Sequence, residues 1–589
     1  MASPTRRKRR KDTRAPVAAP AAPPAPDAAA APDAATAGAT AARVPLAWSA
    51  AVALVALVVY LVQTPAVSGD KDSSEFTLVL ALNGVAHPTG YPLYTLFGHQ
   101  FVLLVHALGA SWAYASNAWG AVGGALAMFF LHRLALALVP ASAPLARRSR
   151  FLLGLLPVAL LAFDPIWTIE TTLAEVYSWH VAWVLGSSLF FVNSVRALAA
   201  GGTWPARRLY ARAAAWGLLC GIGGAHHATA IFVAVPLSLA LFIVLLARQR
   251  PGFGRALGLG LAVLGAALVP LASYLIILWR ASHPAQIQWT ALTPGLQGLI
   301  VHVSGRQYAH NLGRFAPSLE QIRFLRWYVW PLLVPGLVLL AAAAVTARGL
   351  AERVLSWTLC AAALAGGAYA FDYGVGDPSS YFLYPMALGL AAGAPVGASL
   401  LAGGATVRRA ALAAGALVGL AAAVLWVPWL RVGSQRVGLY VSFDRFVHEM
   451  WTSIPMDTAI VFWTNDMYYK LQEYQMLGHE RPGIYVTHAL SLYTPGTRRR
   501  FQDRFGFDPT EGIVLKARFP LGPGAWDSLT RQAVARAEGA VNAGTRYPVI
   551  HFDPEVPTVR LLRKPGAAPP PDASDSARAA AAGAGRAGR

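Results

Sequence analysis

The chain has 589 residues, 56% of them hydrophobic, and a mean hydropathy of +0.45. This composition excludes an ordinary soluble globular protein of such length. Many apolar runs approach the roughly 20 residues that span a bilayer, whereas a closed β-barrel would show short alternating segments. We therefore expect an all-α polytopic membrane protein.

The formal net charge of +21 raises the question of nucleic-acid binding. The basic residues lie in an N-terminal cluster, between apolar runs and in the C-terminal portion, and basic residues between spans report membrane topology. We expect no nucleic-acid partner. Cys220 and Cys360 both lie in apolar runs, so we interpret them as small buried hydrophobes rather than disulfide or metal ligands.

In chain order, residues 1–45 form a basic tail rich in Ala and Pro, which we expect to be disordered and cytoplasmic. About eleven spans follow, and every strongly basic short loop then falls on the cytoplasmic side. The predicted spans are 46–64, 114–138, 151–166, 173–196, 211–224, 227–247, 255–279, 327–347, 353–371, 380–402 and 408–429.

The segment 65–112 is predicted to be one long outer loop. Residues 91–108 are apolar enough to be a span, but counting them would place the basic cluster 147–150 outside. We therefore expect helices lying along the membrane surface near 73–85 and 91–108. The transmembrane domain is then 46–430.

The chain after residue 430 is less apolar and should also lie outside the membrane. Its strand-like runs, Ala459–Trp463 and Gly483–Val486, predict a small C-terminal extracytoplasmic α/β domain over 431–565. A second disordered tail is expected over 566–589. The expected location is a bacterial inner membrane, crossed many times.

Polar side chains gather at the outer ends of the spans, where ionisable residues are costly and usually functional. Most of them alone have a structural explanation, as a solvated loop residue, a turn former or an interfacial anchor. Glu175 is the exception, because a carboxylate one turn into an apolar span requires a partner or a water-filled cavity. Together they bring carboxylates, cations and aromatic rings to one membrane face. The candidates are Asp72, Glu75, His87, Tyr91, Glu175, Tyr177, His226, His227, Arg280, Arg306, Tyr308, Asp377 and Tyr381.

This combination suits the transfer of a sugar from a lipid phosphate. A carboxylate takes the proton of an acceptor hydroxyl, and cationic or hydrogen-bonding groups stabilise the departing phosphate. Aromatic rings suit both a sugar face and the membrane interface. The membrane supplies the lipid donor.

Two stretches of the first outer loop resemble the signature of a known family. They are Asp72-Ser-Ser-Glu75 and Val85-Ala-His-Pro-Thr-Gly-Tyr-Pro-Leu-Tyr94. The family is an uncharacterised bacterial membrane family, related to eukaryotic transmembrane protein O-mannosyltransferases and placed in the GT-C glycosyltransferase superfamily. Ser74 and Thr89 depart from its pattern, which usually has Gly and Pro there, but neither change removes a chemical group.

The resemblance implies a GT-C-like fold, a polyprenyl-phosphate sugar donor, often carrying mannose, and an acidic base in the first outer loop. No nucleotide-sugar fold is expected. The acceptor would be an extracytoplasmic protein or glycan. No cofactor is certain and no metal ligand is assigned; a divalent metal stays open, since some relatives use one and others do not.

We assign Asp72 as the general base, with Glu75 as the alternative, because residues three apart on a helix share one face. Their helix phase, which decides which carboxylate faces the substrate, is left open. Transfer would be a single inverting displacement. The residues expected to shape the sugar site or to hold the donor phosphate are His87, Glu175, Arg280, Arg306 and His227.

Two other classes of protein remain as alternatives. A secondary transporter or lipid flippase would have many spans, but its ionisable residues should lie near the bilayer midplane, often with internal repeats. A non-catalytic assembly protein would need no clustered carboxylates. The depth of the polar residues therefore discriminates among the three classes.

Overall fold

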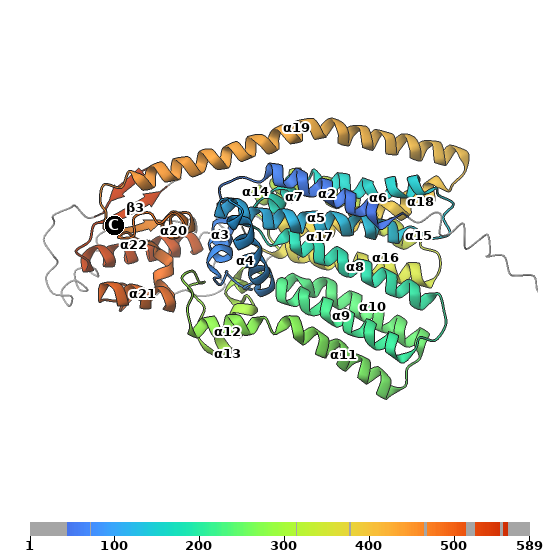
Figure 1. Cartoon of the computed structure of the whole chain (residues 1–589), viewed down its shortest axis with the longest axis horizontal. Coiled ribbons are helices and arrows are strands. Elements are labelled where there is room, and N and C mark those ends of the chain that lie inside the picture. Colours follow the sequence, from blue (N-terminus) through green and yellow to red (C-terminus); the bar gives the residue numbers. More distant parts are fainter. Residues whose placement is uncertain are drawn as a thin grey trace, which may run out of the picture. The chain divides into compact units, whose positions relative to one another are not determined.

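The computed structural model describes residues 44–70, 72–313, 315–375, 378–463, 468–513, 525–553 and 558–562. These residues are mostly helical and carry one small sheet near the C-terminal end of the chain (Figure 1). The predicted class, a multi-span helical membrane protein with a small α/β portion, is confirmed.

Seven stretches of the described chain are long and apolar enough to cross a membrane. They are α2 (Leu46–Gln63), α5 (Trp112–Leu138), α8 (Tyr177–Ala199), η1 with α10 (Ala228–Ala230 and Ile231–Gln249), α11 (Phe253–Leu271), α16 (Leu350–Asp372), and η3 with α17 and α18 (Ser379–Phe382, Leu383–Ala391 and Gly393–Leu401).

Two bent helix pairs raise the number to nine if each pair is one span. The pairs are α6 (Arg147–Ala162) with α7 (Pro165–Thr172), bent by 79°, and α14 (Leu319–Tyr328) with α15 (Trp330–Thr346), bent by 68°. Helices α9 (Ala206–His226) and α19 (Ala405–Thr452) occupy the remaining predicted spans. The count of eleven stays a prediction.

The segment 65–112, which was predicted to be the first outer loop and keeps that name below, contains two short helices, as predicted. Helix α3 (Asp72–Leu82) and helix α4 (Pro92–Ala107) pack on each other and on α5. With 16 residues, α4 is about 24 Å long, less than the ~30 Å hydrocarbon thickness. Phe76 packs its ring against Tyr91 and Tyr94, which fixes the two helices together.

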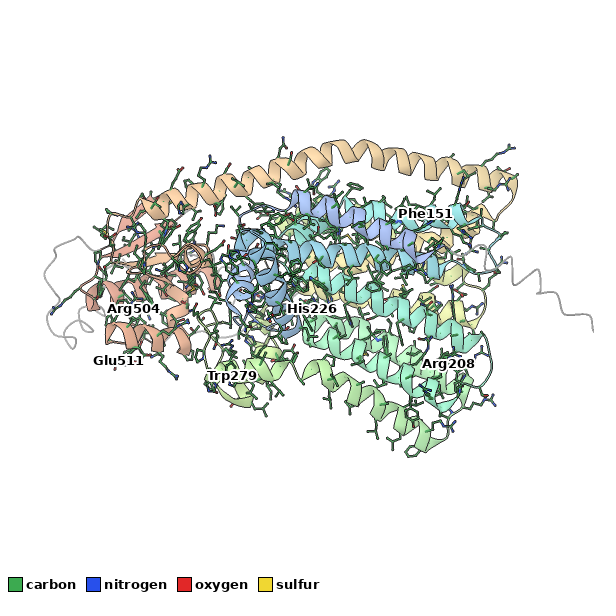
Figure 2. The ribbon with its side chains drawn as sticks, in the orientation of Figure 1. Phe151, Arg208, His226, Trp279, Arg504 and Glu511 are labelled. Carbon is green, nitrogen blue, oxygen red and sulfur yellow. The ribbon has the colours of Figure 1, made fainter. Side chains whose placement is uncertain are left out.

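The two ends of the helices differ in charge. Helix α9 begins beside Arg208 and ends at His226, so these residues lie at opposite ends of it (Figure 2). Helix α8 ends near Arg196, which pairs at 2.9 Å with Glu352 in the first turn of α16. The basic loops and the polar motifs therefore occupy different ends of these helices.

Two segments differ from the predicted spans. The span expected at 255–279 is interrupted, because α11 ends at Leu271, just after Pro270, and a separate helix α12 (Tyr274–Ser282) follows. A proline weakens the helix around it. Helix α19 has 48 residues and is about 72 Å long, so it continues well past a bilayer.

The predicted domain boundary at residue 430 lies within α19, which leads into the α/β portion (Figure 1). The sheet has the strand order β2-β1-β3-β4, with β1 parallel to β2 and β3, and β4 antiparallel. Strand β1 matches the first predicted run, and β2 begins two residues later than the second one. The elements are β1 (Ile460–Trp463), α20 (Tyr468–Met476), β2 (Tyr485–His488), η4 (Ala489–Tyr493), α21 (Pro495–Phe505), α22 (Ala525–Gly544), β3 (Val549–Asp553) and β4 (Thr558–Leu561).

Candidate functional site

A cavity of about 340 Å³ lies where the first outer loop meets the ends of the long helices. Its walls come from α3 and the turn after it, from the starts of α8 and η1, from the last turn of α16, from η3 and from α20. The segment between α12 and α14, with its short helices α13 (Gly295–Val303) and η2 (Arg306–Asn311), closes another side. The predicted residues that line it are Asp72, Glu75, His87, Tyr91, Tyr177, His227, Tyr308 and Tyr381.

The two carboxylates of α3 have different environments. The Asp72 side chain is 55% exposed, whereas that of Glu75 is 2% exposed. The backbone N–H of His87 donates to Glu75 Oε1 at 2.7 Å, and His87 Nδ1 lies 2.8 Å from Oε2. Glu75 therefore anchors the turn that carries His87, while Asp72 has its carboxylate open to the cavity.

His87 stands between these two carboxylates. Its Nε2 lies 3.9 Å from Asp72 Oδ2 and 3.1 Å from the Tyr91 hydroxyl, which also donates to the Pro88 carbonyl at 3.2 Å. Burial raises the pKa of Glu75 above its ordinary value, and His87 offsets part of that rise. Asp72, His87 and Glu75 thus form one connected acidic site.

Aromatic rings surround His227 on the other side of the cavity. Its ring centroid lies 5.7 Å from that of Tyr91, 5.6 Å from that of Tyr177 and 6.0 Å from that of Tyr381. The backbone N–H of Thr229 donates to His227 Nδ1 at 3.2 Å. Burial lowers the pKa of His227 to about 3, so the ring is neutral and Nε2 carries its proton.

Two other predicted residues lie behind the cavity wall. His226 Nε2 donates to the carbonyl of Val176 at 3.1 Å and so ties the end of α9 to the turn before α8. Glu175 lies in that turn, where burial and the neighbouring Glu170 raise its pKa. The structure gives His226 a packing role and leaves a substrate role for Glu175 a prediction.

The predicted arginines also lie outside the cavity lining. Arg280 stacks on the Trp279 ring at 4.9 Å and borders a separate small hollow beside α4. Arg306 is exposed at the start of η2, one residue after the lining Gly305. Asp377 lies outside the described residues. A phosphate-binding role for the arginines stays a prediction.

Some lining residues carry no clear sequence signal. Tyr369 and Tyr373, four apart at the end of α16, form a helical pair that could have been read as one face. Thr229 follows the His226–His227 pair and orients the His227 ring. Tyr469 comes from α20 of the α/β portion, about 380 residues after His87, and only the tertiary structure brings it here.

Asp72, Glu75 and His87 also fit a divalent cation. Each offers one ligand atom, and these atoms lie within 4.8 Å of one another. Carboxylates are ligands that Mg²⁺, Mn²⁺ and Zn²⁺ accept, and Zn²⁺ also accepts an imidazole. His87 would use Nε2, since its Nδ1 is already engaged with Glu75.

The fold and the cavity define a multi-span membrane protein with an acidic, aromatic-lined site at one end of its helices. Residues 72–250 match the family model of the protein O-mannosyl-transferase TMEM260 N-terminal domain. This match covers less than half of the chain, and over those residues it confirms the predicted resemblance to transmembrane protein O-mannosyltransferases. No curated protein matches the chain.

Two solved structures of ArnT from Cupriavidus metallidurans are similar to the chain. The one bound to undecaprenyl phosphate has 14% sequence identity and a TM-score of 0.43, and covers 80% of this chain and 96% of that one. The apo structure has 13% identity and a TM-score of 0.38, with coverages of 72% and 84%.

Proposed function

We propose that the protein transfers a sugar from a polyprenyl-phosphate donor to an extracytoplasmic acceptor, with Asp72 as general base. The observation that carries this proposal is the asymmetry of the acidic pair. Asp72 is open to the cavity, while Glu75 is buried and held by two hydrogen bonds to His87. A base needs access to its substrate, and a supporting group needs a fixed place.

In this mechanism the acceptor hydroxyl gives its proton to the Asp72 carboxylate. The resulting oxygen attacks the anomeric carbon, the bond from that carbon to the phosphate oxygen breaks, and polyprenyl phosphate leaves with inversion of the sugar. His87 keeps its place through Glu75 and faces Asp72 with Nε2. His227 Nε2–H is a neutral donor suited to a sugar hydroxyl or a phosphate oxygen.

The position of the site supports a transferase over a transporter. The residues that line the cavity come from loops and helix ends, such as the first turn of α3, the start of α8 and the end of α16. A transporter would hold its substrate near the middle of its spans. With the site at a membrane face, a lipid donor and a water-soluble acceptor reach it from different sides.

Charge balance supports a divalent cation in the reaction. Among the described residues that line the cavity, none is lysine or arginine, while Asp72 and Glu75 are acidic. A departing phosphate adds further negative charge that needs compensation. A cation held by Asp72, Glu75 and His87 would supply that compensation.

Chelation is therefore expected to lower the transfer rate more than tenfold, because the phosphate would leave without its counter-charge. The measurement is transfer from polyprenyl-phosphate mannose by purified protein before and after EDTA treatment, with Mg²⁺, Mn²⁺ and Zn²⁺ added back one at a time. An undiminished rate in excess EDTA would show that the cavity compensates the phosphate by hydrogen bonds alone.

The proposed setting is a bacterial inner membrane with a cytoplasmic N-terminus, an extracytoplasmic α/β portion and a hexose such as mannose as cargo. The test is mass spectrometry of envelope glycans and glycoproteins in a strain that lacks the gene. We expect the loss of one hexose from one class of acceptor, restored by the wild-type gene and not by the Asp72→Asn variant. An unchanged profile would contradict the proposed function.

A further inference from the structure

The α/β portion contributes a residue to the lining of the cavity. Helix α20 packs against α3, and its Tyr469, which is 3% exposed, lines the same cavity as Asp72, Glu75 and His87. One hydrophobic core also runs from Phe76 and Leu80 of α3, through Leu471 of α20, into the sheet at Trp463.

Directly after Tyr469, the Lys470 side chain is buried at 1% exposure and bonded to the first outer loop. Its Nζ donates to the Ser68 hydroxyl at 2.7 Å and to the Ser68 carbonyl at 3.2 Å. The same Nζ lies 2.6 Å from Asp444 Oδ1 of α19 and 3.8 Å from Glu473 Oε2. A buried lysine needs such partners, and here they come from three separate segments.

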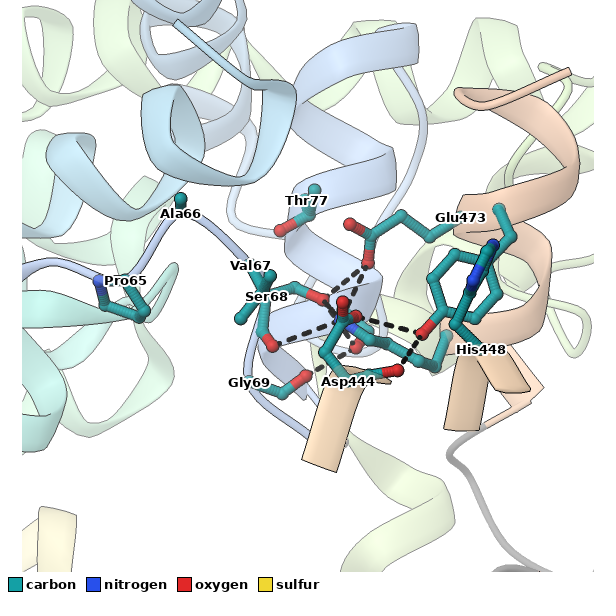
Figure 3. Close-up of polar contacts among 12 residues, drawn as sticks. Pro65, Ala66, Val67, Ser68, Gly69, Thr77, Asp444, His448 and Glu473 are labelled. Carbon is teal, nitrogen blue, oxygen red and sulfur yellow. Dashed lines mark hydrogen bonds and ion pairs between the residues drawn. The ribbon is translucent and has the colours of Figure 1, made fainter. Parts of the chain in front are cut away.

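We call this network the Lys470 latch; its members are Ser68, Asp444, Lys470 and Glu473. The Ser68 hydroxyl donates to Glu473 Oε2 at 2.5 Å, and Figure 3 shows Ser68, Asp444 and Glu473 converging through these contacts. The hydroxyl of Tyr474 donates to Asp444 Oδ1 at 2.9 Å. Each charged member of the latch therefore has a partner, so the latch is a fixed junction.

The latch is connected to the first turn of α3, which carries Asp72 and Glu75, through two serines of that turn. The backbone N–H of Gly69 donates to Ser73 Oγ at 3.0 Å, and Ser74 Oγ donates to the Gly69 carbonyl at 2.6 Å. Ser73 and Ser74 stand between Asp72 and Glu75 in the first turn of α3. Holding residues 68 and 69 thus holds the turn that presents both carboxylates.

We propose that the α/β portion forms the acceptor side of the transfer site: Tyr469 contacts the acceptor, and Lys470 is a positioning residue for the acidic turn of α3. This proposal rests on the proposed function for its kinetic part only. A lipid-linked donor arrives from the bilayer, whereas α20 belongs to the part of the chain that α19 carries beyond membrane length. Tyr469 therefore stands on the side from which a water-soluble acceptor approaches.

The first test measures the latch without any enzyme activity. Amide hydrogen exchange of residues 72–82 is followed in the full chain in lipid nanodiscs, for wild type, Lys470→Met and Ser68→Ala. Ser68→Ala keeps the charges of the latch and is the milder change. We expect exchange in this helix to rise about tenfold in Lys470→Met and several-fold in Ser68→Ala, because its N-terminal turn loses its anchor.

Arg481→Met is the matched control. Arg481 also belongs to the α/β portion and donates to the carbonyls of Trp451 and Met456, but it does not contact residues 68–75 in the described structure. In the Arg481→Met variant, amide hydrogen exchange should change only near residues 451–456. Unchanged exchange at 72–82 in both latch variants, or an equal rise in Arg481→Met, would overturn the positioning role.

The second test separates acceptor from donor. Transfer of labelled mannose from polyprenyl-phosphate mannose to membranes of the deletion strain is measured for Tyr469→Ala, with Tyr468→Ala as control from the same helix and core. Tyr469→Ala should raise the acceptor amount needed for half-maximal rate about tenfold, with the donor KM unchanged. A rise in donor KM instead, or no change, would overturn the assignment of Tyr469.

The two tests fail in different ways. If wild-type protein transfers no mannose from this donor, the proposed function fails for that donor, while the exchange measurements still decide whether Lys470 positions α3. Normal wild-type transfer with unaltered exchange in both latch variants would leave the function standing and remove the positioning role.

Discussion

Replacing Asp72 by asparagine is expected to slow sugar transfer by about 10²- to 10⁴-fold, the usual contribution of a general base. Asparagine keeps the size of the side chain but cannot take the acceptor proton. Because the Asp72 side chain is 55% exposed, the substitution should leave the thermal unfolding midpoint within a degree or two. The measurement is the initial rate with purified protein and polyprenyl-phosphate mannose.

Asp70→Asn is the matched control for this variant. Asp70 is an exposed carboxylate two residues earlier in the same loop and does not line the cavity. The Asp70→Asn variant should transfer the sugar at close to the wild-type rate. A wild-type rate in Asp72→Asn would exclude Asp72 as the base and leave Glu75 as the candidate.

The second large effect is expected from Glu75→Gln, with a fall in rate of about 100-fold. The two oxygens of Glu75 accept from the backbone N–H of His87 and from its Nδ1. In glutamine, an NH₂ group meets one of these donors, which leaves a buried donor unpaired at a cost of about 1–3 kcal/mol. His87 would then move away from Asp72, and the geometry of proton transfer would be lost.

Glu75 also makes a prediction about pH. In the cation-free protein, burial raises its pKa above the ordinary 4.5, so the folded protein binds this proton more tightly than the unfolded chain. Between 4.5 and the raised value, the contribution of Glu75 to stability therefore grows as the pH falls. Activity should decline over the same window, because a protonated Glu75 accepts only one strong hydrogen bond from His87.

Comparing wild type with Glu75→Gln isolates this group from the other carboxylates. The difference in unfolding midpoint between the two proteins should change with pH in this window, and the acid limb of wild-type activity should be absent in the variant. Glu480→Gln, which disturbs a similar carboxylate–histidine contact with His448 away from the cavity, should keep the wild-type profile. A pH profile shared by all three proteins would contradict the assignment.

Much of the fold follows from hydropathy and charge alone. Apolar length predicts the long helices, and the basic loops predict which ends of them face the cytoplasm, because the hydrocarbon core and the positive-inside rule act on short stretches of sequence. The same reasoning kept residues 91–108 out of the span count, which stays a prediction, and α4 is a helix of 16 residues packed on α3. The spacing of Asp72 and Glu75 likewise placed both on one face of α3.

The environment of each carboxylate depended on contacts that lie far apart in the sequence. Nothing near Glu75 shows that His87 would bury it, or that Asp72 would remain open to the cavity. Arg280 and Arg306 have the right charge for a phosphate, yet helix packing leaves them outside the cavity lining. Side-chain direction is set by packing between elements, which local patterns do not encode.

The largest difference between the sequence-based prediction and the structure concerns α19 and the α/β portion after it. Sequence composition separates residues 431–565 from the membrane helices, and two of the strands were recognised from their apolar runs. The continuous α19 and the core shared by α3 and α20 instead join this portion to the first outer loop. Tyr469 and Lys470 acquire their places only because a buried lysine and an apolar helix face must find partners, and those partners lie about 400 residues away.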